Sequence, residues 1–473
     1  AEWEDILMYV SERLAKWATS VASEHTPAAR LSAKHAIQDV VGCMIAGAGD
    51  EGAAKVRDAV NGLGDGRSVI AGRLVQTSSP YAALANGMAA HALDFDDTFL
   101  ESITHASAVL VPALFALGDE MNASGADIVD AYIVGLELHG ALGKALNRSH
   151  YDQGWHATST LGVIGTAGAC ARLMKLDETR FAHALNLAVS SCAGTKVQFG
   201  SMAKPLHAGL AAKNAVEAAK LAAAGVEGHV TAFEGPMGLM QMFGGPSAPG
   251  WEAAFMVLGG KLAIERQGLT VKRFPCCAAT HRALDCVLSL MEKHDFGADD
   301  VASVDVQVRA GHVQNLRYSN PNNEFEARFS MQYCVAVALR YGAVRLFDFT
   351  PAAVGRAEIR ALFPKIIMRQ HDLENGSGED SLTPSIVTIT LNDGRIVSAR
   401  QELPKGDAGN PLNDRERDAK FMDCSQGFLA DADIALLRRG IQDMDNLVSI
   451  RELTHLLRFE AGCDHGERFE RRA

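Results

Sequence analysis

Residues 80–98 read PYAALANGMAAHALDFDDT, a stretch in which small and apolar residues lead into three carboxylates. Its first part predicts a helix that packs closely against its neighbours. Asp94 and Thr98 are four residues apart, so a helix that continues through them places both on one face. If that face is buried, the acid needs a partner. The alternative is a helix end whose aspartates cap the next segment.

Helical spacing of apolar residues extends outward from this stretch in both directions. It predicts helices over 8–22, 28–47, 80–93, 107–121, 127–147, 157–174, 178–192 and 207–224. After residue 268 the pattern changes: residues 301–309 alternate with period two, and residues 385–400 predict a hairpin around Asn-Asp-Gly. Strands are expected there and essentially nowhere else. Helical spacing returns after a polar loop that follows Pro404.

The predicted fold class is therefore mainly α. A large all-helical domain is built from both chain ends, residues 1–268 and 405–473, and a smaller α+β lid domain, residues 269–404, is inserted between them. A chain of 473 residues is long enough for two domains and an enclosed site.

Composition excludes several classes of function. The chain has 45 Lys and Arg against 57 Asp and Glu, a formal net charge of −12, which argues against nucleic acid or anionic membranes as partners. Nine cysteines without CxxC spacing predict reduced thiols in a cytoplasmic protein. An acidic start and the lack of a long apolar span predict no signal peptide or membrane helix. No P-loop, HExxH or EF-hand pattern occurs, so no cofactor and no metal is predicted.

Two stretches in the helical part concentrate titratable groups among small residues. His156 stands at the expected start of a helix, where the helix dipole disfavours the imidazolium form and favours a neutral base or donor. A satisfied core histidine is the alternative. Lys204 precedes Pro205, which is expected to open a helix and to hold the lysine extended, ready for a substrate carboxylate. Ser201 and Lys204 also have Ser-x-x-Lys spacing, but the accompanying motifs of serine acyl-transfer enzymes are missing.

Two more stretches lie where the pattern becomes α+β. Lys272 and His281 fall in a basic segment, which is either a binding site at a domain boundary or a basic linker. Tyr333 heads an apolar helix and is either a site residue or part of the core. Together the four stretches predict a pocket with cations for carboxylates and Asp, His and Tyr groups for proton transfer.

Five ordered blocks resemble the MmgE/PrpD family across nearly the whole chain. They are HALDFDDTF (91–99), HASAVLVPALFAL (105–117), GWHATSTLGVIGTAGACARLMKLD (154–177), MAKPLHAGLAAKNAVEAAKLAAAG (202–225) and KRFPCCAATHRALD (272–285). The resemblance implies a helical domain of both termini, an inserted lid, a homodimer and no cofactor. Activities known in the family are 2-methylcitrate dehydration, cis-aconitate decarboxylation and iminodisuccinate epimerisation.

The resemblance also implies site residues and a reaction. All three activities move a proton beside a carboxylate of a small polycarboxylate, so the site needs fixed positive charge and a base. Epimerisation of iminodisuccinate by an isomerase is the predicted reaction, the two lyase reactions are the alternative, and a non-catalytic metabolite-binding relative is the alternative of another class. The predicted catalytic residues are Asp94, His105, His156, Tyr151 and Tyr333, and the predicted substrate-binding residues are Thr98, Lys204, Lys272 and His281. Asp96 and Asp97 are expected to be structural.

Overall fold

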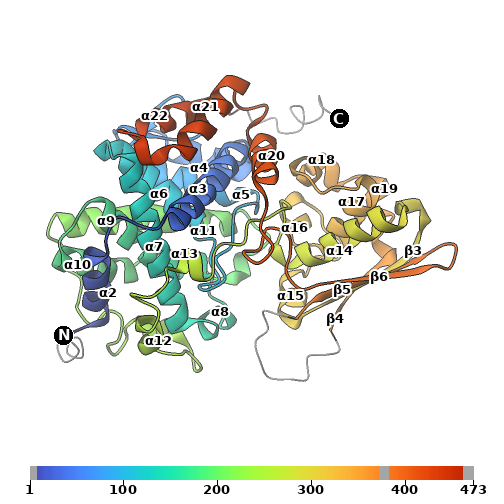
Figure 1. Ribbon diagram of the computed structural model, residues 1–473, viewed down its shortest axis with the longest axis horizontal. Coiled ribbons are helices and arrows are strands. Elements are labelled where there is room, and N and C mark those ends of the chain that lie inside the picture. Colours follow the sequence, from blue (N-terminus) through green and yellow to red (C-terminus); the bar gives the residue numbers. More distant parts are fainter. Residues whose placement is uncertain (1–7, 372–382, 462–473) are drawn as a thin grey trace. The chain divides into compact units, whose positions relative to one another are not determined.

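The computed structural model describes residues 8–371 and 383–461, and the fold is mainly α, as predicted (Figure 1). The chain divides into two compact units. Among the described residues, unit 1 comprises residues 8–92, 96–270 and 417–461. Unit 2 comprises residues 271–371 and 383–416 together with the short loop Leu93–Phe95.

Unit 1 is a set of packed helices whose bounds lie close to those predicted from the sequence. Side-chain oxygens fix several of their starts: those of Thr26, Ser124 and Asp177 each accept a hydrogen bond from a backbone N–H of the first turn. The longer helices are α2 (Val10–Ser20), α3 (Pro27–Gly47), α4 (Glu51–Ala59), α5 (Ser79–Ala92), α6 (Ser107–Met121), α7 (Gly125–Leu146), α9 (Ala157–Leu173), α10 (Glu178–Val189), α11 (Ala203–Ala223), α20 (Asp414–Ser425) and α21 (Asp431–Gln442). Shorter ones are α8 (Ser149–Asp152), α12 (Trp251–Phe255), α13 (Ala263–Arg266) and α22 (Arg451–Thr454).

Helices α5 and α11 touch backbone to backbone. A Cβ atom on Gly87 of α5 would lie 2.7 Å from the Cα of Gly209 on α11, and one on Gly209 would collide with the carbonyl oxygen of Leu84. Both contacts are closer than real Cβ atoms allow, so this crossing needs glycine on both helices. Helix α11 also packs along α9, and α7 packs along α9. The small residues of the opening stretch therefore set the spacing at the centre of unit 1.

Two predictions for unit 1 are corrected. A small antiparallel pair, β1 (Ser68–Val69) with β2 (Gln76–Thr77), lies in the connection before α5, where no strand was expected. Lys204 is not extended, because α11 begins at Ala203 and includes both Lys204 and Pro205. The N–H groups of a first helical turn have no intrahelical partner, so proline does not exclude this turn from the helix.

Unit 2 is built on a four-stranded sheet with strand order β4-β3-β5-β6. β3 (Val301–Val308) pairs parallel with β4 (Ile366–Gln370) and antiparallel with β5 (Ser385–Leu391), and β5 forms the predicted hairpin with β6 (Ile396–Gln401). Alternate residues of β3 and β5, including Val304, Val306 and Ile389, are buried. α14 (Ala278–His294) lies along β5 and β6 and packs against α17 (Met331–Tyr341) (Figure 1). The remaining helices are α15 (Ala310–Asn315), α16 (Glu324–Ala327), α18 (Pro351–Val354) and α19 (Ala357–Arg360).

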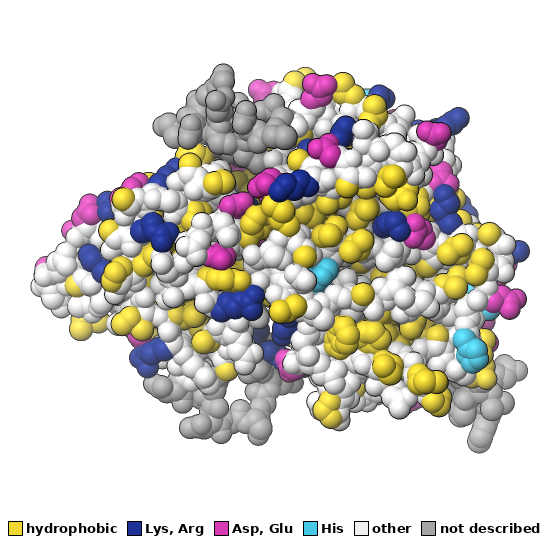
Figure 2. Space-filling model, turned by 180° about the vertical axis from the view of Figure 1, so that it is seen from behind, with side chains coloured by type: hydrophobic (Ala, Val, Ile, Leu, Met, Phe, Trp, Pro, Cys, Tyr) yellow, Lys and Arg dark blue, Asp and Glu magenta, His cyan; other side chains and the backbone are white. Residues whose placement is uncertain are grey.

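The surface carries charges of both signs. On the face shown in Figure 2, lysine and arginine side chains alternate with acidic, apolar and neutral ones and do not gather into one continuous basic area.

Among the residues that the structure describes, no helix combines the length and the apolar character needed to cross a bilayer.

Candidate active site

The loop after α5 carries the acids of the opening stretch, and its backbone differs from the prediction. Helix α5 ends at Ala92, and Asp94 has a φ of 52°, in the left-handed region. Asp94 and Thr98 therefore do not share a helix face. Aspartate tolerates this conformation better than most residues because its short side chain can bond locally. Beyond the turn, Thr98 pairs with Thr270 through both backbone hydrogen bonds, at 2.8 and 2.9 Å.

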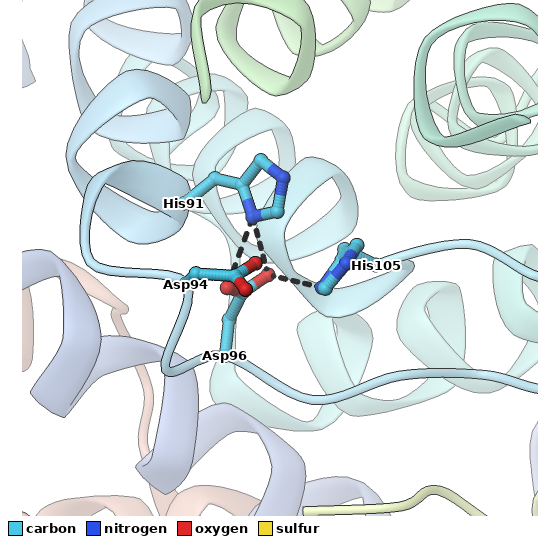
Figure 3. A group of neighbouring side chains, drawn as sticks. All are labelled: His91, Asp94, Asp96 and His105. Carbon is cyan, nitrogen blue, oxygen red and sulfur yellow. Dashed lines mark hydrogen bonds and ion pairs between the residues drawn. The ribbon is translucent and has the colours of Figure 1, made fainter. Parts of the chain in front are cut away.

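Asp96 is the shared partner of two imidazole rings (Figure 3). Nδ1 of His91 lies 3.0 Å from each carboxylate oxygen of Asp96, and Nδ1 of His105 lies 3.0 Å from Oδ2. The ring centroids of His91 and His105 are 4.3 Å apart. The side chains of Asp96 and His91 are fully buried, whereas 14% of the His105 side chain is exposed. Asp96 therefore holds His105, a residue predicted to be catalytic, and the structural role expected for Asp96 stays a prediction.

The charges in this group follow from burial and from the neighbours. Burial alone would raise the pKa of Asp96, but the imidazoles of His91 and His105, whose Nδ1 atoms lie against its oxygens, outweigh burial and hold that pKa well below its usual range. Burial, only partly offset by Asp96, lowers the pKa of His91 to about 3. At neutral pH Asp96 is thus a carboxylate and His91 a neutral imidazole.

A second imidazole pair lies beside the first. His156 is the residue that precedes α9, and its Nδ1 lies 2.9 Å from Nδ1 of His207 on α11. Its ring centroid is 6.0 Å from that of His91, and Phe199 packs edge-on against it. Burial and then the positive charge of Lys204 lower the pKa of His156 well below its usual range, and the same two causes lower the pKa of His207. The neutral form predicted for His156 thus arises chiefly from burial.

Lys204 supplies positive charge to this part of unit 1. It lies in the first turn of α11, is 4% exposed, and places its Nζ 5.7 Å from the ring centroid of Phe199. Its charge contributes to the lowered pKa values of His91, His156 and His207. Unit 1 therefore joins a buried cation, neutral imidazoles and one ionised carboxylate.

Asp97 and Thr98, which follow Asp96, have different surroundings. Asp97 accepts a hydrogen bond from Ser107, whose hydroxyl also contacts that of Tyr132 at 2.6 Å. Burial raises the pKa of Asp97 to about 8, so this carboxyl is neutral at pH 7. Thr98 has a buried hydroxyl that finds no hydrogen-bond partner within residues 8–371 and 383–461. The bond from Ser107 gives Asp97 a structural contact within unit 1. The hydroxyl of Thr98 is able to donate a hydrogen bond to a ligand.

Unit 2 contains its own buried ion pair. Nζ of Lys272 lies 2.9 Å from Oδ1 of Asp94 and donates to the Asp94 carbonyl oxygen at the same distance. Both side chains are almost wholly buried, at 1% and 5% exposure. His281, on α14, has its Nε2 3.1 Å from the carbonyl oxygen of Cys276 and packs edge-on against Phe274. The structure thus joins two of the predicted residues, Asp94 and Lys272, directly.

Comparison with known proteins gives these geometries a context. The profile of the MmgE/PrpD N-terminal domain matches residues 12–252, and that of the MmgE/PrpD C-terminal domain matches residues 274–442. The chain belongs to the MmgE/PrpD family. Among its relatives are cis-aconitate decarboxylase of Homo sapiens, 29% identical over 80% of this chain and 79% of the relative, and cis-aconitate decarboxylase of Aspergillus terreus, 24% identical over 95% of this chain and 96% of the relative.

The two tyrosines predicted as catalytic are engaged elsewhere in this MmgE/PrpD chain. Tyr333 is fully buried in the core of unit 2, and its hydroxyl donates to the carbonyl oxygen of Asp348. Burial raises the pKa of this hydroxyl. Tyr151, on α8, has the amine of Lys196 3.8 Å above its ring. The bond of the Tyr333 hydroxyl to Asp348 sets it apart from the other predicted residues. The catalytic roles of both tyrosines stay predictions.

Four groups of this MmgE/PrpD chain have the chemistry to ligate a metal: His91, Asp94, Asp96 and His105 offer one nitrogen or oxygen each, all within 4.8 Å of one another. Their present bonds work against that role. The oxygens of Asp96 already serve two imidazoles, and Asp94 is paired with Lys272. Buried ammonium groups also repel a cation. We therefore assign no metal ligand here.

Sequence reasoning missed three residues of this site. The sequence predicted no role for His91 or His207 and only a structural one for Asp96. A signal existed for His207, because it lies three residues after Lys204 and so on the same side of a helix. For His91 and Asp96, five residues apart across a chain turn, local spacing gave none.

Proposed function

We propose that this chain is a lyase that acts on small polycarboxylates with its own side chains, and that decarboxylation of cis-aconitate is the first reaction to test. The observation that carries the proposal is the buried grouping of Lys204 with the neutral imidazoles of His91 and His156. A buried ammonium group attracts carboxylates strongly because the local dielectric is low, and neutral imidazoles can accept and return protons. The two relatives named above support the choice of substrate.

The chemistry assigns tasks to these groups. Loss of carbon dioxide from cis-aconitate breaks a carbon–carbon bond, leaves the electron pair on an allylic carbon framework, and ends when a proton is added to carbon. The enzyme must hold the remaining carboxylates beside positive charge and deliver that proton. We propose Lys204 and Lys272 for the carboxylates. We propose His105 and His156 for proton transfer.

Three further residues are proposed to bind or orient the substrate. The buried hydroxyl of Thr98 can donate to a carboxylate, which agrees with the binding role predicted for it. His281 is proposed as a second donor on the strength of its motif. Asp94 is proposed to orient Lys272 through their 2.9 Å ion pair. Replacing Asp94 by Asn should therefore weaken carboxylate binding, which a rise in KM would report.

Epimerisation of iminodisuccinate, the reaction predicted from the sequence, is kept as the second candidate. An epimerase needs two separate proton-carrying groups, one for each face of the reacting carbon. The structure offers two imidazoles with separate partners, His105 on Asp96 and His156 on His207. The relatives named above are lyases, so this reaction stands second.

One panel of assays separates the candidates. The purified protein is incubated with cis-aconitate while carbon dioxide release is measured, with 2-methylcitrate while water loss is followed, and with one enantiomer of iminodisuccinate in deuterium oxide. Carbon dioxide release supports the first proposal, and deuterium uptake with racemisation supports the second. Binding of all three compounds without any turnover would leave the non-catalytic metabolite-binding reading.

We also propose that the protein is a homodimer that acts in the cytoplasm, as the sequence predicts. Light scattering coupled to gel filtration should then give about twice the chain mass of 50.4 kDa. A mass equal to one chain would contradict the dimer.

A further inference from the structure

We propose that Asp96 is a positioning residue that fixes His91 and His105 in the same tautomer and lets only His105 take up a proton during the reaction. The inference rests on the proposed function for its catalytic consequence, but its structural part can be measured without substrate. Figure 3 shows the arrangement: the rings of His91 and His105 approach the carboxylate of Asp96 from two directions, each with Nδ1 toward it.

The tautomers follow from hydrogen-bond chemistry. Asp96 is ionised, and an ionised carboxylate has only acceptor sites. Nδ1 of His91 is hydrogen-bonded to both oxygens at 3.0 Å, so it must carry a proton and donate it. Nδ1 of His105 lies 3.0 Å from Oδ2 in an ion-pair contact, where a proton is favoured because a lone pair would face the lone pairs of the carboxylate. A neutral imidazole has one N–H, and Nε2 is then left as a lone pair.

His91 is held in that neutral state. Its side chain is fully buried, and its Nε2 has no hydrogen-bond partner in the part of the chain that the structure describes. The depressed pKa of His91, about 3, arises from burial first, and the positive charges of Lys204 and His105 lower it further. Protonating Nε2 would therefore create a buried charge without a partner, which is costly. His91 acts as a fixed neutral ring beside Asp96.

His105 differs because 14% of its side chain is exposed. The single negative charge of Asp96 can balance one imidazolium, and with ring centroids 4.3 Å apart two imidazoliums would repel each other. The more exposed ring is the one that can exchange a proton at Nε2. The other carboxyl groups near Asp96 do not compete for this role, since Asp94 is paired with Lys272, Asp97 is neutral at pH 7 and Asp39 is paired with a lysine.

Replacing Asp96 by Asn tests the proposal. An amide has one oxygen that accepts and one nitrogen that donates. Because Nδ1 of His91 lies 3.0 Å from both oxygens of Asp96 and Nδ1 of His105 lies 3.0 Å from Oδ2, the NH2 group faces Nδ1 of at least one ring in either orientation and favours a lone pair there. We expect kcat to fall by about 10²- to 10⁴-fold, as when the carboxylate of a carboxylate–imidazole pair is lost, while KM stays within about threefold because Asp96 does not touch the substrate. The apparent pKa of the essential imidazole in the pH profile of kcat/KM should also fall.

Asp97→Asn is the matched control. It makes the same change at the next buried residue, but there the carboxyl is neutral and bonds to Ser107. The control should keep the wild-type kcat and pH profile. Equal losses in both variants would overturn the proposal, because any substitution in this loop would then have the same effect.

The tautomers can be read directly from ¹⁵N-histidine-labelled protein by NMR, with His91→Gln and His105→Gln variants used to assign the two rings. The wild type should show both rings as Nδ1–H, and Asp96→Asn should convert one of them to Nε2–H. An Nε2–H tautomer at either ring of the wild type would overturn the proposal even if Asp96→Asn fails to fold. Because this measurement needs no substrate, it separates failure of the proposal on Asp96 from failure of the proposed lyase activity.

Discussion

Nδ1 of His156 lies 2.9 Å from Nδ1 of His207, and both rings are held neutral by burial and by the charge of Lys204. A hydrogen bond between two imidazole nitrogens contains a single proton, so one ring donates and the other accepts. The tautomer of His156 is therefore set by His207, a residue on another helix.

Replacing His207 by Leu should slow turnover. The nitrogen of His156 would lose its buried partner, which costs about 1–3 kcal/mol and corresponds to roughly 5- to 150-fold in rate. His207→Gln is the control, because its amide can both donate and accept, and it should retain more activity than the leucine variant. Steady-state kinetics on the substrate identified by the assay panel measures both variants. If leucine and glutamine behave alike, the hydrogen bond does not control His156.

Replacing Lys204 by Gln should shift the pH profile upward. The ammonium charge helps to lower the pKa values of His91 and His156, so its removal raises them. The acid limb of kcat/KM should then move to higher pH, and KM should rise as a carboxylate partner is lost. Lys213→Gln on the same helix is the control, because Lys213 is paired with Glu217. An unchanged acid limb in Lys204→Gln would show that its charge does not act on the imidazoles.

Replacing Asp97 by Asn should remove a pH-dependent part of the stability. The pKa of Asp97 is about 8 in the folded protein against 3.8 without burial, so between these values only the folded state keeps the proton. The free energy of unfolding therefore falls as pH rises through this window, by roughly 3–6 kcal/mol in full. In urea unfolding from pH 5.5 to 8.5, the free energy of unfolding of the wild type should fall relative to that of the variant as pH increases. If the free energies of unfolding of the wild type and the variant change in parallel with pH, Asp97 has no raised pKa in the folded protein.

Most helices were predictable because their determinants are local. The caps Thr26 and Ser124 and the periodic small residues define helix bounds without any knowledge of the fold. The end of α5 was predicted to within a residue, at 93 against Ala92, but the left-handed backbone of Asp94 was not predicted. After the helix has ended, the backbone of Thr98 pairs with that of Thr270, a residue far along the chain, and local spacing does not predict such a contact. The role of Asp96 likewise depends on where α5 and the segment before α6 meet, and no spacing rule reports that.

Replacing Lys420 by Met should destabilise unit 1. Nζ of Lys420, on α20, lies 2.7 Å from Oδ1 of Asp39, on α3, and both side chains are almost wholly buried, at 6% and 7% exposure. Removing one partner of such a pair leaves a buried charge and costs about 3–5 kcal/mol. The double variant Asp39→Leu with Lys420→Met should recover most of that loss. Urea unfolding of the wild type, both single variants and the double variant tests it, and additive losses would contradict a coupled pair.

The glycine contact between α5 and α11 bears on how sequence variants of this protein should be interpreted. Helix α5 carries His91 and helix α11 carries Lys204 and His207, so the distance between imidazole and amine depends on Gly87 and Gly209, which contribute no functional group. A change of Gly87 to Ala adds one methyl group and alters no charge, hydrogen bond or site residue. Such a change would count as conservative by chemical similarity, yet it would force apart the two helices that carry the chemistry. Loss of activity in this protein can therefore originate at positions that carry no functional group.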